Sequence, residues 1–577
     1  DSIYRLVDDM SKVPDSKDKR RVWIDSQTEE EILRGIKEAK PLSEYDNLSN
    51  SAYLRAKEDY LMGINFSRIL SVVYGQTVND CVKSKKWLAI SVGRVMTCVL
   101  GMIVNREREI RNFVKTPFYR IFGEFSFDEF TFAAEWKVTE QSKYYGTPHL
   151  YKDNGFKDRK TAETFLEELK PEREAVVKSI EKKKEKKNPP LLFNLAELQN
   201  ICSKLFKISP DQTLSITQEL YEKKLVTYPR TDARVLSTAI AKEIHKNIQG
   251  LLSYPITAQY AQDILENKRY SGIVKTKYVN DSQITDHYAI IPTGQGLGAL
   301  KGLSQLAANV YEVITRRFLS VFYPAAVYQK ISVAVATVSP EEYLYTNNKI
   351  LIDSGFLPVS EFSFKKKGSG TQEKGQKDTE GAVNKDIQDD GADSESENIQ
   401  TMTDEEFALL IKSIKAGTKL TLKGLNIKEG ETSPPKRYNS GQMILAMENA
   451  GQLIEDEELR AQIKGSGIGT SATRAEILKK LVNIEYIKLN KKTQIYTPTF
   501  IGESVYEIVG ASIRSMLDPK LTASWELGLS QVADGTITEQ VYMDKLEGFI
   551  RRNVDYVKDN NFIPAMRQRI TKLKAYY

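Results

Sequence analysis

The sequence is poor in cysteine and histidine, the residues on which many metal sites depend. It has only three of each in 577 residues, and Cys81, Cys98 and Cys202 are far apart with no CxxC pair. A disulfide framework and a zinc ribbon both need paired or clustered cysteines, so both are excluded. A histidine-based metal site is equally unexpected, and the cysteine usage fits a reducing cytoplasm.

Long hydrophobic runs are also lacking. The most apolar run, residues 95–104, is too short to span a bilayer and has Arg94 at its entrance. No membrane segment is therefore predicted. Hydrophobic content of 41% and charged content of 28% are those of an ordinary globular protein, and roughly four domains are expected at ~150 residues each.

The net charge of +6 is small, but the basic residues are clustered in 181–187 (EKKKEKK) and 551–574. A basic stripe can attract a polyanion even when the overall charge is low. The alternative is a solvated helix face, which we favour for the lysine run.

Sequence periodicity divides the chain into regions that recur in mirror order. Helical signals dominate residues 26–115 and 434–556. Alternating segments such as YRIFGEFSF and KISVAVATV predict antiparallel strands in 116–194 and 323–433. Residues 195–322 between them are again helical. The nested order suggests that the chain goes out and returns through the same domains, giving a closed or arched body.

Three further segments complete this division. Residues 1–25 read as a helix, a charged turn and a strand at the end of an α/β unit, and residues 557–577 as a basic tail. Residues 365–400 have almost no large apolar side chains, so a disordered insertion is predicted there.

The stretch LVTYPRTDAR, residues 225–234, is the strongest candidate for a functional site. A helix over 214–223, a β-type run and a proline-stiffened corner resemble a winged helix and would place Tyr228 on an exposed edge. Arg230 follows it closely. A free phenol has a pKa of ~10 and is only ~0.1% ionised at pH 7, so a nearby guanidinium would favour the nucleophilic phenolate and bind a phosphate. The alternative for Arg230 is a salt bridge to Asp232.

This stretch belongs to a series of motifs whose order resembles that of the type IA DNA topoisomerases, bacterial topoisomerase III in particular. The series is RAKEDYLMGINFSRIL (55–70), SVGRVMTCVLGMIVNREREI (91–110), PPLLFNLAELQ (189–199), KKLVTYPRTDAR (223–234), DHYAIIPT (286–293), PPKRYNSGQMILAMEN (434–449), GIGTSATRAEI (467–477) and LTASWE (521–526).

The resemblance implies a multidomain α/β (α+β) protein built as a toroidal arch, with helical domains, a winged-helix-like tyrosine domain and antiparallel β segments. It implies ATP-independent cleavage of single-stranded DNA through a 5′-phosphotyrosine, then strand passage and religation. Tyr228 matches the nucleophile, Arg230 the arginine that holds the scissile phosphate, and His287 a histidine lining the same site. A buried structural role is the alternative for His287.

Five more residues lie in motifs that resemble DNA-binding segments of the family: Arg94, Arg68, Gln199, Thr473 and Arg474. Arg94 follows a glycine at a helix start, where backbone N–H groups and a cation suit a phosphate. The family usually has glutamine two positions later, whereas this chain has Met96.

The family's magnesium site is not recognisable in this chain. It belongs to an N-terminal Toprim domain with a DxDxE-type acidic cluster, and residues 1–25 resemble only the end of that domain. We therefore expect Mg²⁺ to bind outside this chain and the isolated fragment to be inactive. Expected partners are single-stranded and negatively supercoiled or catenated DNA, bound by a cytoplasmic monomer.

Two other functions are compatible with parts of the sequence. A non-catalytic clamp for single-stranded DNA could use the same fold, and Met96 and the missing Toprim portion favour it. A tyrosine recombinase would need its tyrosine after an Arg-His-Arg set, whereas His287 here follows Tyr228.

Overall fold

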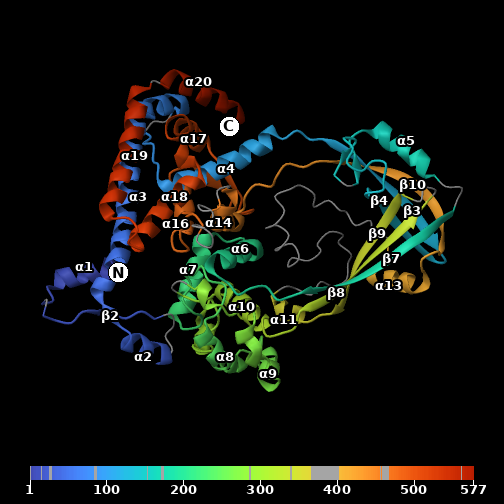
Figure 1. The fold of residues 1–577 in the computed structure, drawn as a ribbon, viewed down its shortest axis with the longest axis horizontal. Coiled ribbons are helices and arrows are strands. Elements are labelled where there is room, and N and C mark those ends of the chain that lie inside the picture. Colours follow the sequence, from blue (N-terminus) through green and yellow to red (C-terminus); the bar gives the residue numbers. More distant parts are fainter. Residues whose placement is uncertain are drawn as a thin grey trace.

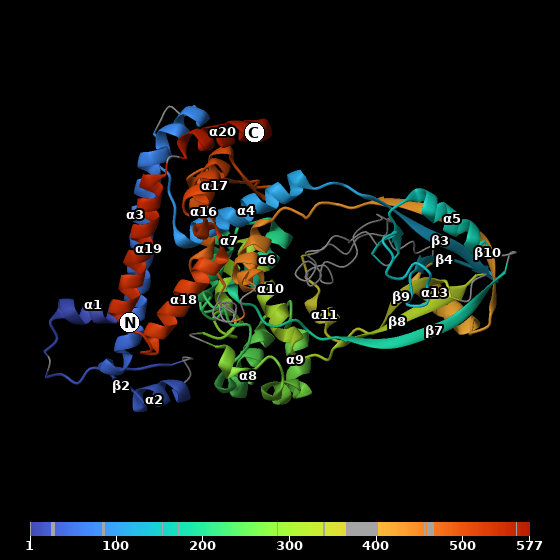
Figure 2. The ribbon, with the colours of Figure 1, turned by 45° about the horizontal axis from the view of Figure 1, so that its top comes forward.

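A computed structural model of the chain describes residues 2–577 except 15, 25–28, 84–86, 153, 171–173, 285–286, 338–340, 365–401, 455–456, 458–466 and 561. The predicted disordered insertion thus lies outside the described residues. Helices gather at one end of the molecule and strands at the other, and the chain runs between the two ends along an upper and a lower route (Figure 1). The turned view shows the same arch (Figure 2).

The helical body is made from both ends of the sequence, as the mirror order predicted. Its long helix α3 (Asp46–Val82) buries one stripe along its length, with Leu54, Met62, Phe66, Leu70 and Tyr74 all 0% exposed. This spacing of four to eight residues keeps the apolar side chains on one helix face. The other elements are α4 (Arg94–Asn112), α14 (Ser440–Glu448), α16 (Arg474–Asn483), β11 (Ile487–Leu489), β12 (Tyr496–Pro498), α17 (Phe500–Ser512), α18 (Pro519–Ala533), α19 (Glu539–Asp559) and α20 (Ile563–Leu573).

The predicted basic tail is largely this last helix, α20, which packs on α3 and α17 through buried Met566 and Ile570. At the other end of the chain, helix α1 and a short strand pair precede α3. These elements are α1 (Ser2–Ser11), β1 (Arg20–Arg21), α2 (Glu29–Lys37) and β2 (Lys40–Pro41). None of the described helices is long and apolar enough to cross a membrane.

The strands form an antiparallel sheet in the order β10-β7-β8-β9-β4-β3-β6-β5, and β10 also pairs with β3. The sheet therefore closes on itself as a six-stranded barrel extended by β6 and β5. Its elements are β3 (Pro117–Phe127), β4 (Phe130–Lys137), β5 (Leu150–Tyr151), β6 (Gly155–Phe156), α5 (Arg159–Leu169), β7 (Glu174–Lys187), β8 (Ala326–Ala336), β9 (Tyr343–Asp353), α13 (Asp404–Ser413) and β10 (Lys419–Glu431).

The lysine run 181–187 is not a helix face, as we had expected, but the second half of strand β7. It pairs with β8 along its whole length, down to Lys187 opposite Ala326. Cross-strand partners explain the difference, because Glu185 of β7 binds Lys330 of β8 and Lys349 of β9. Tertiary pairing thus overrides the helical reading of a charged run.

Most of the tyrosine region lies between β7 and β8 in the sequence, and it forms a helical unit that a short helix after β9 completes. Helix α7 begins as predicted, with Ser209 as N-cap in a capping box with Gln212 and Pro210 in the first turn. The elements are α6 (Leu195–Phe206), α7 (Pro210–Glu222), α8 (Thr238–Gly250), α9 (Ala258–Glu266), α10 (Gln305–Ser320) and the short α11 (Leu357–Ser360).

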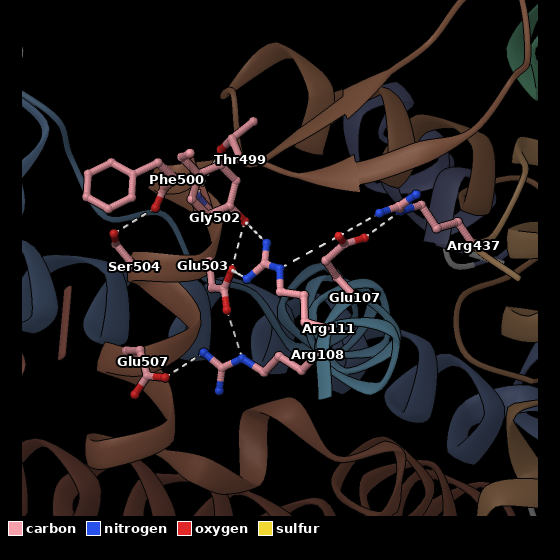
Figure 3. Close-up of polar contacts among 11 residues, drawn as sticks. Glu107, Arg108, Arg111, Arg437, Thr499, Phe500, Gly502, Glu503, Ser504 and Glu507 are labelled. Atoms are coloured by element: carbon pink, nitrogen blue, oxygen red, sulfur yellow. Dashed lines mark hydrogen bonds and ion pairs between the residues drawn. The ribbon is translucent and has the colours of Figure 1, made fainter. Parts of the chain in front are cut away.

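An ionic network joins the two upper connections between the helical body and the barrel (Figure 3). Arg437, on the return from β10, donates two hydrogen bonds to Glu107 of α4 at 2.7 and 2.9 Å. Buried Glu503 of α17 accepts from Arg108 and Arg111 at 2.9 and 2.7 Å. The hydrogen bonds from Arg437 hold the pKa of Glu107 below its usual range. The outgoing and returning segments are therefore fixed to one another where they leave the helical body.

Candidate functional site

The segment around Tyr228 is held against residues 287–292. Val226 and Pro292 form an isolated antiparallel bridge, and the Thr227 backbone N–H donates to Ile291 O at 3.0 Å. The predicted strand is thus one bridging pair, since Pro229 and Pro292 have no N–H to extend a ladder. The Thr227 hydroxyl accepts from Ile291 N at 3.0 Å, which fixes the backbone next to the tyrosine.

Tyr228 and His287 meet at this site, as the sequence predicted. Their ring centroids are 4.5 Å apart with planes inclined by 50°, and the Tyr221 ring packs edge-on to Tyr228 at 5.4 Å. Tyr228 is half-buried and His287 exposed. The Thr231 hydroxyl donates to His287 O at 2.7 Å, so the two motifs that supply the rings are bonded together.

Arg230 lies at the same corner with its side chain exposed. The alternative of a salt bridge to Asp232 is wrong, because the Asp232 carboxylate pairs with Arg474 at 2.9 Å. Among the residues that the structure describes, none forms a hydrogen bond or ion pair with Arg230. A guanidinium in this state can take an incoming phosphate without first breaking a protein contact.

The Asp232–Arg474 pair lies at a seam between the tyrosine unit and the helical body. Asn194, the N-cap of α6, donates to Asp232 O at 3.1 Å and to Glu448 Oε1 at 2.5 Å. Burial raises the pKa of Glu448. Two segments of the helical body therefore hold the tyrosine loop.

Close packing of α6 on α14 extends this seam. The hydroxyls of Ser203 and Ser440 are 2.9 Å apart, and both are buried. A Cβ at Gly441 would lie 2.5 Å from Asn200 Cα, so only glycine fits between the helices. The seam is a close-packed contact that must separate if the tyrosine unit moves away from the helical body.

Arg94, a predicted phosphate contact, is buried in a cluster of carboxylates. It is 4% exposed, with Nε 3.1 Å from both Glu58 and Asp59 and Nη1 2.9 Å from Glu526. Burial lowers the pKa of Arg94, but the three carboxylates outweigh it and the pKa is raised. Met96 lies in the apolar core, 5% exposed.

Glu58 is the most enclosed member of this cluster, at 0% exposed. Burial raises its pKa to about 7, against the opposing effects of Arg94 and of the Tyr542 hydroxyl, which donates to it at 2.7 Å. The group therefore titrates near neutrality.

The other predicted DNA-binding residues divide into exposed and buried positions. Arg68 on α3 and Thr473 at the start of α16 are exposed. Gln199 is 1% exposed and donates to Pro210 O at 3.0 Å, and Arg474 is also 1% exposed. Thus Gln199, Arg474 and Arg94 contact protein groups here, and only Arg68 and Thr473 offer an accessible surface.

Four further residues of the site were not predicted from the sequence: Thr227, Thr231, Asn194 and Glu448. The two threonines stand within the LVTYPRTDAR motif, where hydroxyls beside a turn often bond to backbone. The Asn194–Glu448 contact joins residues 254 positions apart, and no local pattern signals it.

Comparison with known proteins places the chain in a family. A family model described as DNA topoisomerase matches residues 43–544. The chain is 30% identical to DNA topoisomerase 3 of Bacillus licheniformis, covering 97% of this chain and 67% of that protein. It is 31% identical to DNA topoisomerase 3 of Bacillus subtilis strain 168, covering 94% and 65%.

The chain thus spans about two thirds of the length of these curated relatives. The solved structure of full-length topoisomerase I from Thermotoga maritima has a TM-score of 0.61 at 20% identity, over 96% of this chain and 76% of that one. This likeness confirms the predicted fold, an arch of helical domains and antiparallel strands. Since the family model covers most of the sequence, the chain belongs to the type IA DNA topoisomerases, and within them it is similar to topoisomerase III.

Proposed function

We propose that Tyr228 cleaves single-stranded DNA by forming a 5′-phosphotyrosine, after which another DNA segment passes through the break and the strand is resealed. The observation that carries this proposal is the position of Tyr228. Its ring lies 4.5 Å from that of His287, beside an exposed Arg230. A phenol, an imidazole and a guanidinium at one accessible corner can bind and attack a phosphodiester.

The reaction is a transesterification. Tyr228 Oη loses its proton and attacks phosphorus, the P–O3′ bond breaks, and the departing O3′ takes up a proton. Resealing is the reverse, with the 3′-hydroxyl attacking the phosphotyrosine. One phosphoester bond replaces another in each direction, so no ATP is required.

The residues of the chain have distinct proposed roles in this reaction. Arg230 binds the non-bridging phosphate oxygens and stabilises the charge that develops on them. His287 lines the phosphate site next to the phenol. Thr227 and Thr231 hold the two backbones that carry these side chains. Arg68 and Thr473 are proposed contacts for the DNA strand, since both are exposed.

Arg94, Gln199 and Arg474 need a different account, because their side chains are buried. We propose that they reach DNA only after the contacts described above rearrange. Arg474 would leave Asp232 when the seam opens, and Arg94 would exchange a carboxylate for a phosphate. Strand passage itself would separate the tyrosine unit from the helical body at this seam.

Magnesium is the cofactor that the family resemblance implies. Among the described residues no group of three or more His, Cys, Asp or Glu side chains is arranged to hold a metal ion. The described residues therefore do not fit a magnesium site. We propose that Mg²⁺ is bound by protein outside residues 1–577. Proposed substrates are negatively supercoiled or catenated DNA, acted on by a cytoplasmic monomer.

The test is a cleavage assay with the full-length gene product, single-stranded DNA and Mg²⁺, stopped by rapid denaturation. A label at the 3′ end of the DNA should migrate with the protein. A label at the 5′ end should instead be on the free fragment that ends in the new 3′-hydroxyl. Tyr228→Phe should form no adduct, and Tyr221→Phe, which keeps the edge-on ring, is the matched control. A 3′-labelled adduct that persists in Tyr228→Phe would overturn the assignment.

A clamp for single-stranded DNA is the second candidate. The burial of Arg94 among three carboxylates favours it, because this cation, expected to contact a DNA phosphate, is already neutralised by protein. If the protein bound single-stranded DNA but formed no covalent adduct under conditions in which a relative cleaves the same DNA, the clamp function would be supported.

A further inference from the structure

Lysine residues are concentrated in the part of the sheet where strands β7, β8 and β9 extend toward the tyrosine unit. We call this part the lysine ribbon: residues 181–187, 326–332 and 347–353. Its β7 segment has five lysines and two glutamates, a net charge of +3. Lys182, Lys183, Lys184 and Lys186 are exposed. Lys330 and Lys349 add two cations, and Asp353 is the only further acidic residue.

Three of these lysines form a row across the strands. Lys183 is the register partner of Lys330, which in turn is the partner of Lys349. Directly opposed residues lie on the same face of a sheet, with strands ~4.8 Å apart. Like charges in such a position destabilise the sheet, and lysine is disfavoured in strands. Stability therefore does not account for the row.

Among the described residues, one carboxylate is ion-paired with the row. Glu185 binds Lys330 and, at 2.7 Å, Lys349. Hydrogen bonds from Lys330 and then Lys349 lower the pKa of Glu185 to about 2. Lys183 has no hydrogen bond or ion pair with any residue that the structure describes. Glu185 is thus the one carboxylate in the described part of the chain that is ion-paired with lysines of the row, and Glu181 lies on the same face two residues before Lys183. With these two glutamates counted, the row still has a surplus of one positive charge, which faces solvent.

The chemistry of the ribbon identifies the kind of anion that fits it. Lysine ammonium groups on flexible stems contact phosphate as point charges without reading a sequence. Surfaces that bind single strands add open aromatic rings on which bases stack. The only aromatic residue of the ribbon is Tyr328, and the Lys349 ammonium lies over its ring at 4.3 Å. A duplex, whose bases are already stacked inside, matches this surface better than a single strand.

The ribbon leads directly to the tyrosine site. Beyond Lys187 the chain reaches Phe193, which pairs with Ile290, and Leu195 N donates to Thr231 O at 3.1 Å. In both views β7 and β8 run from the barrel toward the tyrosine unit (Figures 1 and 2). A duplex on the ribbon would therefore lie beside the unit that carries Tyr228.

We propose that the lysine ribbon binds the phosphate backbone of double-stranded DNA, independently of sequence, as a contact separate from the single-strand site at Tyr228. The inference rests on the proposed function, because it takes DNA as the substrate. The ribbon holds a duplex segment close to the break while Tyr228 acts on a single strand.

The test measures binding of a fluorescent duplex to the 577-residue chain over a range of salt concentrations. The variant Lys183→Gln/Lys330→Gln/Lys349→Gln removes the row and keeps the side-chain length. The matched control, Lys160→Gln/Lys412→Gln/Lys415→Gln, removes three exposed lysines from the same domain. Duplex affinity depends on salt with a log–log slope of about −0.9 per phosphate contact, so the row variant should have a slope shallower by about 2 to 3.

The same two variants are then assayed with a single-stranded oligonucleotide. The proposal expects the row variant to bind it within about twofold of the parent chain and to keep the Tyr228 adduct in the full-length protein. A row variant whose duplex slope equals that of the control overturns the proposal. The proposal is overturned as well if the row variant loses more affinity for the single strand than for the duplex. Because binding is read without cleavage, failure at the ribbon is distinguishable from failure of the phosphotyrosine reaction.

Discussion

Asp232, four residues after the candidate nucleophile, is ion-paired at 2.9 Å with Arg474, a residue 242 positions later in the chain. Arg474 is 1% exposed and the Asp232 side chain 27%. The pair fastens the tyrosine loop to the start of α16, so opening of the seam and movement of the tyrosine loop are coupled.

Asp232→Asn should loosen this loop, because it removes the carboxylate that is ion-paired with the buried Arg474 guanidinium. Removing one partner of a buried pair costs on the order of 3 kcal/mol, which corresponds to about 10²-fold faster amide hydrogen exchange in the opened segment. The increase should appear in residues 225–236 and in α16. The double variant Asp232→Asn/Arg474→Met removes both charges and should recover much of the protection. Equal exchange in the single and double variants would contradict the coupling.

Arg230→Ala should separate catalysis from stability. The side chain is exposed and bonds to no described residue, so thermal unfolding should shift by less than about 0.5 kcal/mol. The cleavage rate of the full-length protein should fall about 10²- to 10³-fold, as when a donor to a developing oxyanion is lost. Arg234→Ala is the control, since that side chain donates to Leu192 O at 3.2 Å within the protein. If the Arg230→Ala variant cleaved DNA at the rate of the parent protein, Arg230 would have no part in the reaction.

Gly441→Ala should force α6 and α14 apart. Glycine to alanine inside a helix normally stabilises by about 1 kcal/mol, but here the new Cβ would lie 2.5 Å from Asn200 Cα. Overpacking of this kind costs about 1 to 3 kcal/mol, so the net effect should be destabilising. Gly510→Ala in α17 is the matched control, because its Cβ would meet nothing closer than 3.7 Å and should stabilise. The measurement is the unfolding temperature of both variants.

Glu58→Gln should change how stability depends on pH. The pKa of Glu58 is raised by burial from 4.5 to about 7, so the folded protein keeps a proton that the unfolded chain has released. The stabilisation is complete below pH 4.5 and is lost as pH rises through about 7, a change on the order of 3 kcal/mol. Glutamine stays neutral and still accepts from Tyr542, while Asp59 and Glu526 remain on Arg94.

The unfolding temperature of Glu58→Gln should therefore rise relative to the parent chain between pH 5 and pH 8. Glu109→Gln, whose side chain is 58% exposed, should keep a constant difference over the same range. Parallel profiles for the parent chain and Glu58→Gln would show that Glu58 does not titrate in this window.

Glu503→Gln should destabilise the base of the arch. Glu503 is 1% exposed and binds both Arg108 and Arg111 (Figure 3), so neutralising it removes the buried anion that these two guanidinium groups share. A loss on the order of 3 kcal/mol is expected, measured by hydrogen exchange in α4 and α17. Glu38→Gln, whose side chain is 60% exposed, should change exchange little. Comparable effects of both substitutions would argue against the network as a structural support.

Local patterns predicted the parts of the molecule that depend on neighbours in sequence. The alternation of YRIFGEFSF predicted strand β3, and Ser209 and Pro210 predicted the start of α7. The LVTYPRTDAR and DHYAIIPT motifs contain Tyr228 and His287, whose rings are in contact. What the sequence could not predict are contacts between distant segments. The motifs predicted Arg94 and Arg474 as accessible DNA contacts. Both are instead buried and ion-paired with carboxylates from distant parts of the chain. The strand at 181–187 was missed for the same reason, since its partners lie on β8 and β9.

The register of β7 and β8 has a consequence for how the molecule is constructed. Lys187 is paired with Ala326, so residues 188–325 leave and re-enter the barrel at one point. In topological terms, residues 188–325 are the loop of a β-hairpin that has grown into a domain. Replacing them with a two-residue turn should leave a closed barrel. The part of the tyrosine unit within residues 188–325 could accordingly be exchanged between relatives as a cassette, provided that the strand ends, the contact of α10 with α11 and the seam are matched.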